Sequence, residues 1–151
     1  MRILGLDVGD RRTGVALSDP LGMLASPLLV FQLKGETEDI AFILNLVEQY
    51  KVEKIIVGLP QSMNGTIGTQ AEKVKGFGDK LRESCPIPVE YRDERLTTVE
   101  AKRMLIESGN KKYGKNKKIE YDAAAAAVIL QSYLNEARPL KYPSEDQFIK
   151  E

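Results

Sequence analysis

The chain has 151 residues, 42% hydrophobic and 29% charged, and its 22 basic and 22 acidic side chains balance to a net charge of zero, which excludes a global field that draws it onto nucleic acid. Histidine is absent, which excludes Ser-His-Asp and Cys-His catalysis, a histidine general base and a histidine-ligated zinc site. The single cysteine, Cys85, permits no internal disulfide, and no apolar run is long enough to span a membrane, so we expect a cytoplasmic protein with no membrane partner.

The first predicted element is an apolar run of strand length at residues 3–8, which one acid, Asp7, interrupts. A run this apolar is typical of a strand that is buried on both faces. Because side chains alternate along a strand, Asp7 shares a face with Ile3 and Gly5. An ionised carboxylate inside such a strand is costly without a partner, so we expect Asp7 to face a cation or an opposite charge.

A tight turn that carries Arg11 and Arg12 follows, and residues 13–17 are predicted to return as a second strand. Residues 23–33 are predicted to form a third strand, which Pro27 bends or interrupts. Three strands joined by short turns must form an antiparallel meander.

The period of the pattern then changes, and the helical spacing of apolar residues predicts four helices, at residues 37–50, from 69 onward, at 97–108 and at 120–136. The second begins with a capping-box pattern, TQAE, in which Thr69 is the expected N-cap. Apolar runs predict two further strands, at residues 53–59 and 89–92. The lysine-rich residues 111–118, which hold no acid, are predicted to form a loop.

The predicted order is three strands, then a helix, a strand, a helix, a strand and two helices. It indicates an α/β fold with a mixed five-stranded sheet, which starts as the antiparallel meander and continues in parallel β-α-β units, flanked by about four helices. We expect a single domain at residues 1–137. Residues 138–151, where prolines lie among scattered charges, are expected to form a flexible C-terminal tail.

Acids stand at three informative positions of this order. Asp7 ends the first strand, Asp93 and Glu94 follow the fifth, and Asp122 falls in the first turn of the predicted last helix. Because the C-terminal ends of parallel strands form the natural site edge of such a sheet, the first two positions map to that edge. The alanines at 123–127 give the last helix high propensity and little bulk, so it would approach the sheet closely and carry Asp122 toward Asp7.

Three carboxylates in one place repel one another and raise each other's pKa. A divalent cation removes this problem, and Mg²⁺ and Mn²⁺ prefer oxygen ligands, which agrees with the missing histidines. Two such ions can activate a water and stabilise a leaving oxygen in phosphodiester cleavage, without a protein general base. We therefore expect Mg²⁺ or Mn²⁺ as the cofactor, bound as two ions.

Four stretches in this order, LGLDVGDRRTGVALSD, GLPQSMNGT, DERLTT and DAAAAAVILQSYL, resemble the YqgF/RuvX family of the RNase H-like nuclease superfamily. The resemblance covers residues 1–134 and implies an RNase H-like fold. It also implies a metal-dependent endonuclease that processes the 5′ end of the 16S rRNA precursor in ribosome biogenesis, or, in an alternative view, a Holliday junction resolvase in DNA recombination and repair. By motif, it assigns catalysis and metal binding to Asp7, Glu94 and Asp122.

The chain departs from the wider superfamily at the end of the fourth predicted strand. RuvC-like nucleases usually carry an acid there, but this chain has Gly58, Leu59 and Pro60. The family pattern suggests that Glu94, one strand over, replaces that acid. The choice between Asp93 and Glu94 as the second ligand stays open.

Each candidate acid also has a simpler explanation. Asp7 could be neutralised by the two arginines of the turn or by backbone amides. Asp122 could be a first-turn acid that the helix dipole favours. Glu94 could pair with Arg92 or Arg95.

Basic side chains beside these acids are candidates for nucleic-acid binding: Arg11, Arg12, Arg95, Lys111, Lys112, Lys115, Lys117 and Lys118. Arginine forks suit phosphate oxygens, whereas the lysines could form a backbone-binding arm or simply a solubilising loop. The expected partner is structured RNA or branched DNA. A monomer and a weak homodimer are both open.

Two other classes of protein share parts of this pattern. The DxGxxxxG spacing of residues 7–14 also occurs in actin-like ATPases and sugar kinases, but those enzymes need two such domains around a nucleotide. A non-catalytic RNA-binding protein of ribosome assembly could keep the same fold. The presence of all three acids argues mildly against that class.

Overall fold

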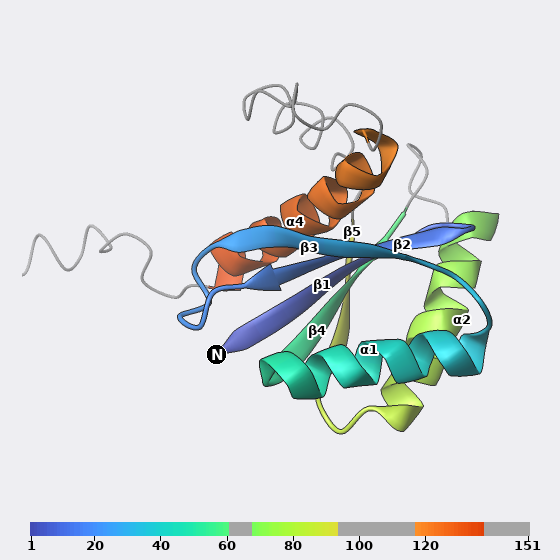
Figure 1. The fold of residues 1–151 in the computed structure, drawn as a ribbon, viewed down its shortest axis with the longest axis horizontal. Helices are drawn as coiled ribbons and strands as arrows, with labels where there is room; N and C mark the ends of the chain where they lie inside the picture. The colour runs from blue at the N-terminus through green and yellow to red at the C-terminus, as the bar shows by residue number, and fades with distance from the viewer. Residues whose placement is uncertain (61–67, 94–116, 138–151) are drawn as a thin grey trace, which may run out of the picture.

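The structure is a computed structural model of the chain, and it describes residues 1–60, 68–93 and 117–137 (Figure 1). In the last of these segments, the side chains are described from Ala123 to Glu136. Three predictions lie outside the described residues: the helix at 97–108, most of the loop at 111–118 and the tail at 138–151.

Five strands form one mixed sheet in the order β3-β2-β1-β4-β5. They are β1 (Arg2–Val8), β2 (Arg12–Ser18), β3 (Ala25–Gln32), β4 (Val52–Leu59) and β5 (Val89–Asp93). The first three pair antiparallel, and β4 pairs parallel with both β1 and β5. The predicted mixed sheet is confirmed, and every strand ends within one or two residues of its predicted bounds.

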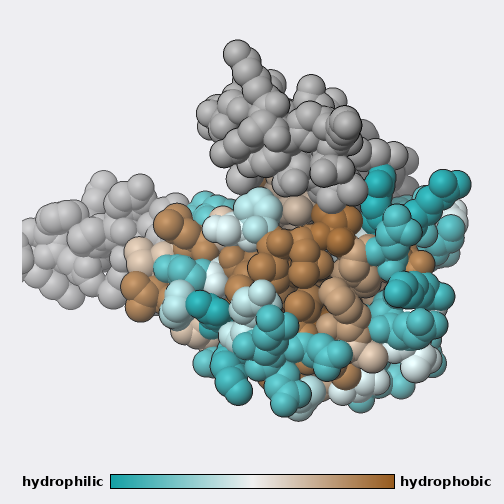
Figure 2. Space-filling view, viewed as in Figure 1, coloured by the Kyte–Doolittle hydropathy of each residue, from teal (hydrophilic) through white to brown (hydrophobic). Residues whose placement is uncertain are grey.

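β3 is an edge strand, and none of its side chains is fully buried. Pro27 does not interrupt this strand but lies beside a register shift between Val15 and Ala16 of β2. An edge strand accommodates proline because the missing N–H can point away from the sheet. Figure 2, in which β3 lies toward the viewer, shows hydrophobic surface across the middle of this face.

Three helices lie within the described segments: α1 (Glu36–Tyr50), α2 (Thr69–Ser84) and α4 (Lys117–Ala137). α1 and α2 cover one face of the sheet and α4 covers the other, which makes three layers (Figure 1). The alternation of β1 separates the two cores. Leu4 and Leu6 pack with α1 and α2, whereas Ile3 and Gly5 lie against α4.

One predicted N-cap and one predicted helix start are wrong. Thr69 is the first helical residue of α2, because Gly68 takes the N-cap position with an extended backbone and no side-chain cap. The helix α4 already includes Lys117, so Lys117 and Lys118 are helical rather than part of a loop, as their good helix propensity permits. Asp122 is therefore the sixth residue of α4, beyond the first turn, and the helix dipole alone does not explain it.

The close approach of α4 to the sheet is confirmed. Every side chain from Ala123 to Leu130 is buried. A Cβ atom built on Gly5 would lie 2.9 Å from Cβ of Leu130 and 3.1 Å from the carbonyl oxygen of Ala126. A larger residue at position 5 would push α4 away, so glycine in β1 and alanines in α4 together set the spacing of these two layers.

Candidate active site

Asp7 is half-buried near the C-terminal end of β1, on the face that α4 covers. Its cross-strand neighbour in β2 is Gly14. On the other side, β1 and β4 are in register at Leu6 and Val57, so the next pair along the two strands is Asp7 and Gly58. Glycines therefore flank Asp7 in both neighbouring strands at this level of the sheet.

The register between α4 and β1 indicates where Asp122 lies along the sheet. Tyr133 bonds to Lys54, the neighbour of Ile3 in the sheet, whereas Ala126 and Leu130 lie against Gly5. Movement toward the C-terminal end of β1 therefore runs backward along α4. Residue 122 lies one helical turn before Ala126 along α4, and Asp7 lies two residues beyond Gly5 along β1. The two steps cover similar distances along the sheet.

This register supports the prediction that Asp122 and Asp7 lie at the same end of the sheet. Figure 1 agrees, because the orange start of α4 lies toward the end of the sheet where β4 and β5 finish. The side chain of Asp122 is outside the described residues, so its approach to Asp7 stays a prediction.

The alternation of β5 distinguishes between the two acids that follow this strand. Tyr91 bonds to Asp79 of α2, and Arg92 bonds to Ser132 of α4, so consecutive residues face opposite layers. Asp93, which is exposed, has the parity of Tyr91 and lies on the face opposite Asp7. This parity favours Glu94 over Asp93 as the second ligand, although Glu94 itself lies outside the described residues.

The turn between β1 and β2 places the two arginines differently. Arg11 is exposed, whereas Arg12 is half-buried and shares the α4 face of the sheet with Asp7, because Gly14, two residues on, is the cross-strand neighbour of Asp7. The amide of Gly9 donates to the carbonyl oxygen of Arg12 at 2.8 Å. A Cβ atom on Gly9 would lie 2.7 Å from that oxygen, so this tight turn requires glycine.

The other basic candidates are not placed by the structure. Arg95, Lys111, Lys112 and Lys115 lie outside the described residues, and for Lys117 and Lys118 the helical backbone alone is described. Their contact with nucleic acid stays a prediction.

The start of α2 reaches the same end of the sheet, which the sequence did not reveal. Gln70 donates a hydrogen bond from Nε2 to the carbonyl oxygen of Val8 at 3.4 Å. Lys73 lies 4.0 Å from the carboxylate of Asp10, in an exposed pair of little energetic weight. A side-chain amide that reaches a strand end across 62 residues leaves no periodic signal in the sequence.

Arg92 is already engaged, which weakens one simpler explanation of Glu94. Its guanidinium lies 2.6 Å from the carboxylate of Glu136 and donates to the hydroxyl of Ser132 at 2.8 Å. The hydrogen bond from Arg92 is the main reason that the pKa of Glu136 is lowered, and the same bond raises the pKa of Arg92. Sequence reasoning considered Arg92 only as a partner of Glu94.

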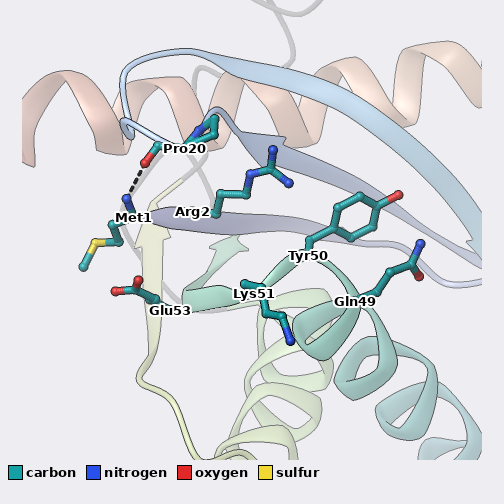
Figure 3. A pocket seen from close by; sticks show the side chains of 7 residues that line it. All are labelled: Met1, Arg2, Pro20, Gln49, Tyr50, Lys51 and Glu53. Carbon is teal, nitrogen blue, oxygen red and sulfur yellow. Dashed lines mark hydrogen bonds between the residues drawn. The ribbon is translucent and has the colours of Figure 1, made fainter.

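A pocket of about 320 Å³ lies at the opposite end of β1 from Asp7 (Figure 3). It is lined by Met1, Arg2, Pro20, Gln49, Tyr50, Lys51 and Glu53. Figure 3 also shows the terminal ammonium group donating to the carbonyl oxygen of Pro20. Because the pocket borders the first residues of β1, it is separate from the site edge at the end of that strand.

The predicted ligands offer carboxylate oxygens alone, which suits a hard divalent cation. Asp7 offers a half-buried carboxylate between two strand glycines at the end of the central strand, and this oxygen donor fits such an ion. Among the described side chains, no three acids, cysteines or histidines gather, but Glu94 and the side chain of Asp122 are not among them. No helix within the described ranges is long and apolar enough to cross a membrane.

Two solved structures have the same fold. One is T. thermophilus RuvC in complex with Holliday junction substrate, with a TM-score of 0.60 and 14% identity over 92% of this chain and 97% of that chain. The other is the Fowlpox virus resolvase with substrate Holliday junction DNA, with a TM-score of 0.59 and 13% identity over 91% of this chain and 99% of that chain. At such low identity, they show the RNase H-like fold and nothing finer.

Sequence relatives are much closer. A protein of Caldanaerobacter subterraneus subsp. tengcongensis is 52% identical over 89% of this chain and 96% of its own length. A protein of Streptococcus equi subsp. equi is 50% identical over 89% of this chain and 98% of its own length. Both are provisionally named pre-16S rRNA nuclease. The family pattern described as "RuvX: Holliday junction resolvase" matches residues 1–136, and the chain therefore belongs to the RuvX (YqgF) family.

Proposed function

We propose that this protein is a metal-dependent endonuclease that cleaves structured nucleic acid, and that its role is the 5′-end processing of the 16S rRNA precursor. The observation that carries the proposal is the position of Asp7, a half-buried acid between two glycines at the C-terminal end of the central strand, beneath α4. The names of the two close relatives support the ribosomal substrate.

In this proposal, Asp7, Glu94 and Asp122 hold two Mg²⁺ or Mn²⁺ ions. When bound, such ions supply an activated water and stabilise the leaving oxygen of a phosphodiester. Asp7 offers its carboxylate from a rigid position, because β1 is bonded to β2 on one side and β4 on the other. Glu94, which directly follows β5 in the sequence, and Asp122 of α4 complete the proposed ligand set.

The arginines of the β1–β2 turn have a separate task. Arg12 shares the face of Asp7, which supports a role in binding a phosphate next to the scissile one, and Arg11 is exposed beside it in the same turn. The lysines near the start of α4 would contact the nucleic-acid backbone without sequence preference. This arrangement needs no net positive charge on the whole protein.

A second candidate function is the resolution of Holliday junctions. The description of the matching family pattern and the fold shared with RuvC favour it. The same three acids would serve both reactions, because a carboxylate site determines the bond that is cut and not the polymer that carries it.

Cleavage assays with two substrates test the proposal: an RNA that spans the 5′ end of the 16S precursor, and a four-way DNA junction. With Mn²⁺, we expect the wild-type protein to cut the RNA, and Asp7→Asn to fall to background. The matched control is Asp10→Asn, which removes an exposed acid three residues away and should cut like the wild type.

The outcomes separate the candidates. Preferred cleavage of the junction would replace the first function by the second. RNA binding without cleavage of either substrate would indicate a non-catalytic assembly factor. A folded Asp7→Asn variant that still cuts at the wild-type rate would remove Asp7 from the mechanism.

A further inference from the structure

Arg92 connects the end of β5 to the C-terminal half of α4 through two side chains. Its Nη1 lies 2.6 Å from Oε2 of Glu136, and its Nη2 and Nε donate to Oγ of Ser132 at 2.8 and 3.2 Å. Ser132 and Glu136 are four residues apart and lie on one face of the helix. We call this group of three residues the Arg92 clamp.

The clamp differs from an ordinary surface ion pair. Exposed pairs contribute little because water screens them and both side chains lose freedom. Here the Arg92 side chain is only 20% exposed, although that of Glu136 is 68% exposed. A planar guanidinium that bonds two acceptors from a covered position also defines an orientation, which a single exposed contact does not.

The apolar core beneath α4 does not reach β5. In the part of the chain with described side chains, the cluster that packs on α4 takes Ile3 from β1, Ala16 from β2 and Ile56 from β4, with Ala25 of β3 at its margin. β5 contributes none of its apolar side chains to it. The backbone ladder to β4 holds β5 in the sheet, and the direct side-chain bonds between β5 and α4 among the described residues are polar.

A second polar contact is further from the strand end. Lys54 of β4 donates to the hydroxyl of Tyr133 at 2.7 Å and lies 3.0 Å from Glu90 of β5. This link runs through Lys54 of β4 and reaches β5 at Glu90, two residues before Arg92. Among the described contacts, the clamp is thus the direct side-chain connection between α4 and the end of β5, which precedes Glu94.

We propose that Arg92 is a positioning residue of this site: by bonding Ser132 and Glu136, it sets the distance between the end of β5, which leads into Glu94, and α4, which carries Asp122. The inference rests on the proposed function, since it concerns the same carboxylates. Ligands for a metal pair must be held within a fraction of an ångström, so a clamp that joins α4 to the strand leading into Glu94 affects ion binding. Arg92 touches no reacting atom in this scheme.

The test is a titration of the protein with Mn²⁺ alone, in which calorimetry and electron paramagnetic resonance measure ion binding. Cleavage assays are run in parallel. We expect Arg92→Ala to raise the Mn²⁺ concentration for half-saturation about tenfold, the scale typical of residues that orient metal ligands. The apparent KM for nucleic acid should change little. Arg92→Lys should restore part of the loss, and Ser132→Ala should give a smaller shift in the same direction.

The matched control is Tyr91→Phe, on the opposite face of the same strand. The Tyr91 hydroxyl contacts Asp79 at 2.7 Å and the carbonyl oxygen of Lys75 at 2.8 Å, so its loss weakens the attachment of β5 to α2 and leaves α4 untouched. We expect a lower melting temperature with unchanged Mn²⁺ half-saturation. A purely structural role for Arg92 predicts the same behaviour for both variants.

The outcomes distinguish this inference from the proposed function. If Asp7→Asn binds Mn²⁺ as the wild type does, both fail together. If binding depends on Asp7 but folded Arg92→Ala saturates at the wild-type Mn²⁺ concentration, the clamp inference alone is overturned. Should Arg92→Ala not fold, Glu136→Gln applies the same criterion, since it changes one exposed oxygen of the clamp.

Discussion

The same two strands, β1 and β4, present different side chains to the two helical layers. Toward α1 and α2, they present large apolar side chains that are completely buried: Leu4, Leu6, Ile55 and Val57. Toward α4, they present small and charged residues among the apolar ones: Ile3, Gly5, Asp7, Lys54, Ile56 and Gly58.

This difference separates stability from chemistry within one sheet. The α1–α2 face buries bulky side chains, which supply hydrophobic free energy in proportion to their area. The α4 face has less bulk, so the helix comes close, and its polar residues lie toward the strand ends and β5. The proposed metal site requires such a thin layer, because a thick apolar core would hold α4 too far from Asp7.

The largest expected effect on stability lies on the α1–α2 face. Leu4→Ala removes a completely buried side chain and should lower the free energy of unfolding by about 2–5 kcal/mol, measured by urea denaturation. Cleavage per folded molecule should stay close to the wild-type value, because Leu4 faces away from α4. A variant that keeps its stability but loses cleavage would contradict the separation of roles.

The next residue, Gly5, gives the opposite expectation. Gly5→Ala introduces a Cβ at 2.9 Å from Leu130, which must shift α4, at a cost of about 1–3 kcal/mol in the free energy of unfolding. The more informative change is in activity, which should fall further than the loss of stability explains, because α4 carries Asp122. Urea denaturation and cleavage by the folded fraction measure the two effects separately. If Leu4→Ala and Gly5→Ala lose cleavage per folded molecule to the same extent, the spacing of α4 does not affect the site.

Thr13 is an exception on the apolar face. It is completely buried, and its hydroxyl has no hydrogen-bond partner among the described residues. Thr13→Val replaces the hydroxyl with a methyl group of similar shape and should raise the free energy of unfolding by about 1 kcal/mol, since a buried unpaired polar group is unfavourable. Urea denaturation tests this, and a clear loss of stability would indicate that the hydroxyl has a partner.

The smallest expected effect is the pH dependence of the Arg92 clamp. The hydrogen bond from Arg92 lowers the pKa of Glu136 below its ordinary 4.5, so the folded state gains stability above that pKa in the unfolded chain and loses it as the pH falls through the lower folded value. Glu136→Gln should therefore reduce the fall in melting temperature that the wild type shows as the pH drops below about 4.5. Since Glu136 is exposed, added salt should shrink the difference from the wild type. Identical pH profiles for Glu136→Gln and the wild type would show that ionisation of Glu136 does not contribute to stability.

Much of the fold follows from local pattern. The apolar run with a single acid predicts β1 and the position of Asp7 near its end. Short turns predict the antiparallel meander, and the change of period predicts α1. These features depend on alternation and helical spacing, which neighbouring residues determine. The alanine-rich segment likewise predicts a closely packed last helix, because small side chains leave little thickness whatever they pack against.

The start of each helix was harder to predict, because capping is a competition between alternatives of similar free energy. The sequence pattern at Thr69 resembles a capping box, yet Gly68 takes the N-cap position. The helical run from Lys117 has good propensity but no apolar spacing strong enough to mark its beginning. Local preference therefore identified both helices, but not the N-cap of α2 or the first residue of α4.

The sequence by itself determined the class of the protein, the order of its elements and the identity of its candidate acids. Only the tertiary structure decided that Gly14 and Gly58 flank Asp7 and that Asp93 lies on the opposite face of the sheet. It also decided that Arg92 bonds to Ser132 and Glu136 of α4, which the sequence did not predict. The physical reason is that strand register and cross-layer bonds join residues that the local pattern does not relate, such as Arg92 and Ser132, which are 40 positions apart, and no local periodicity records which of them meet.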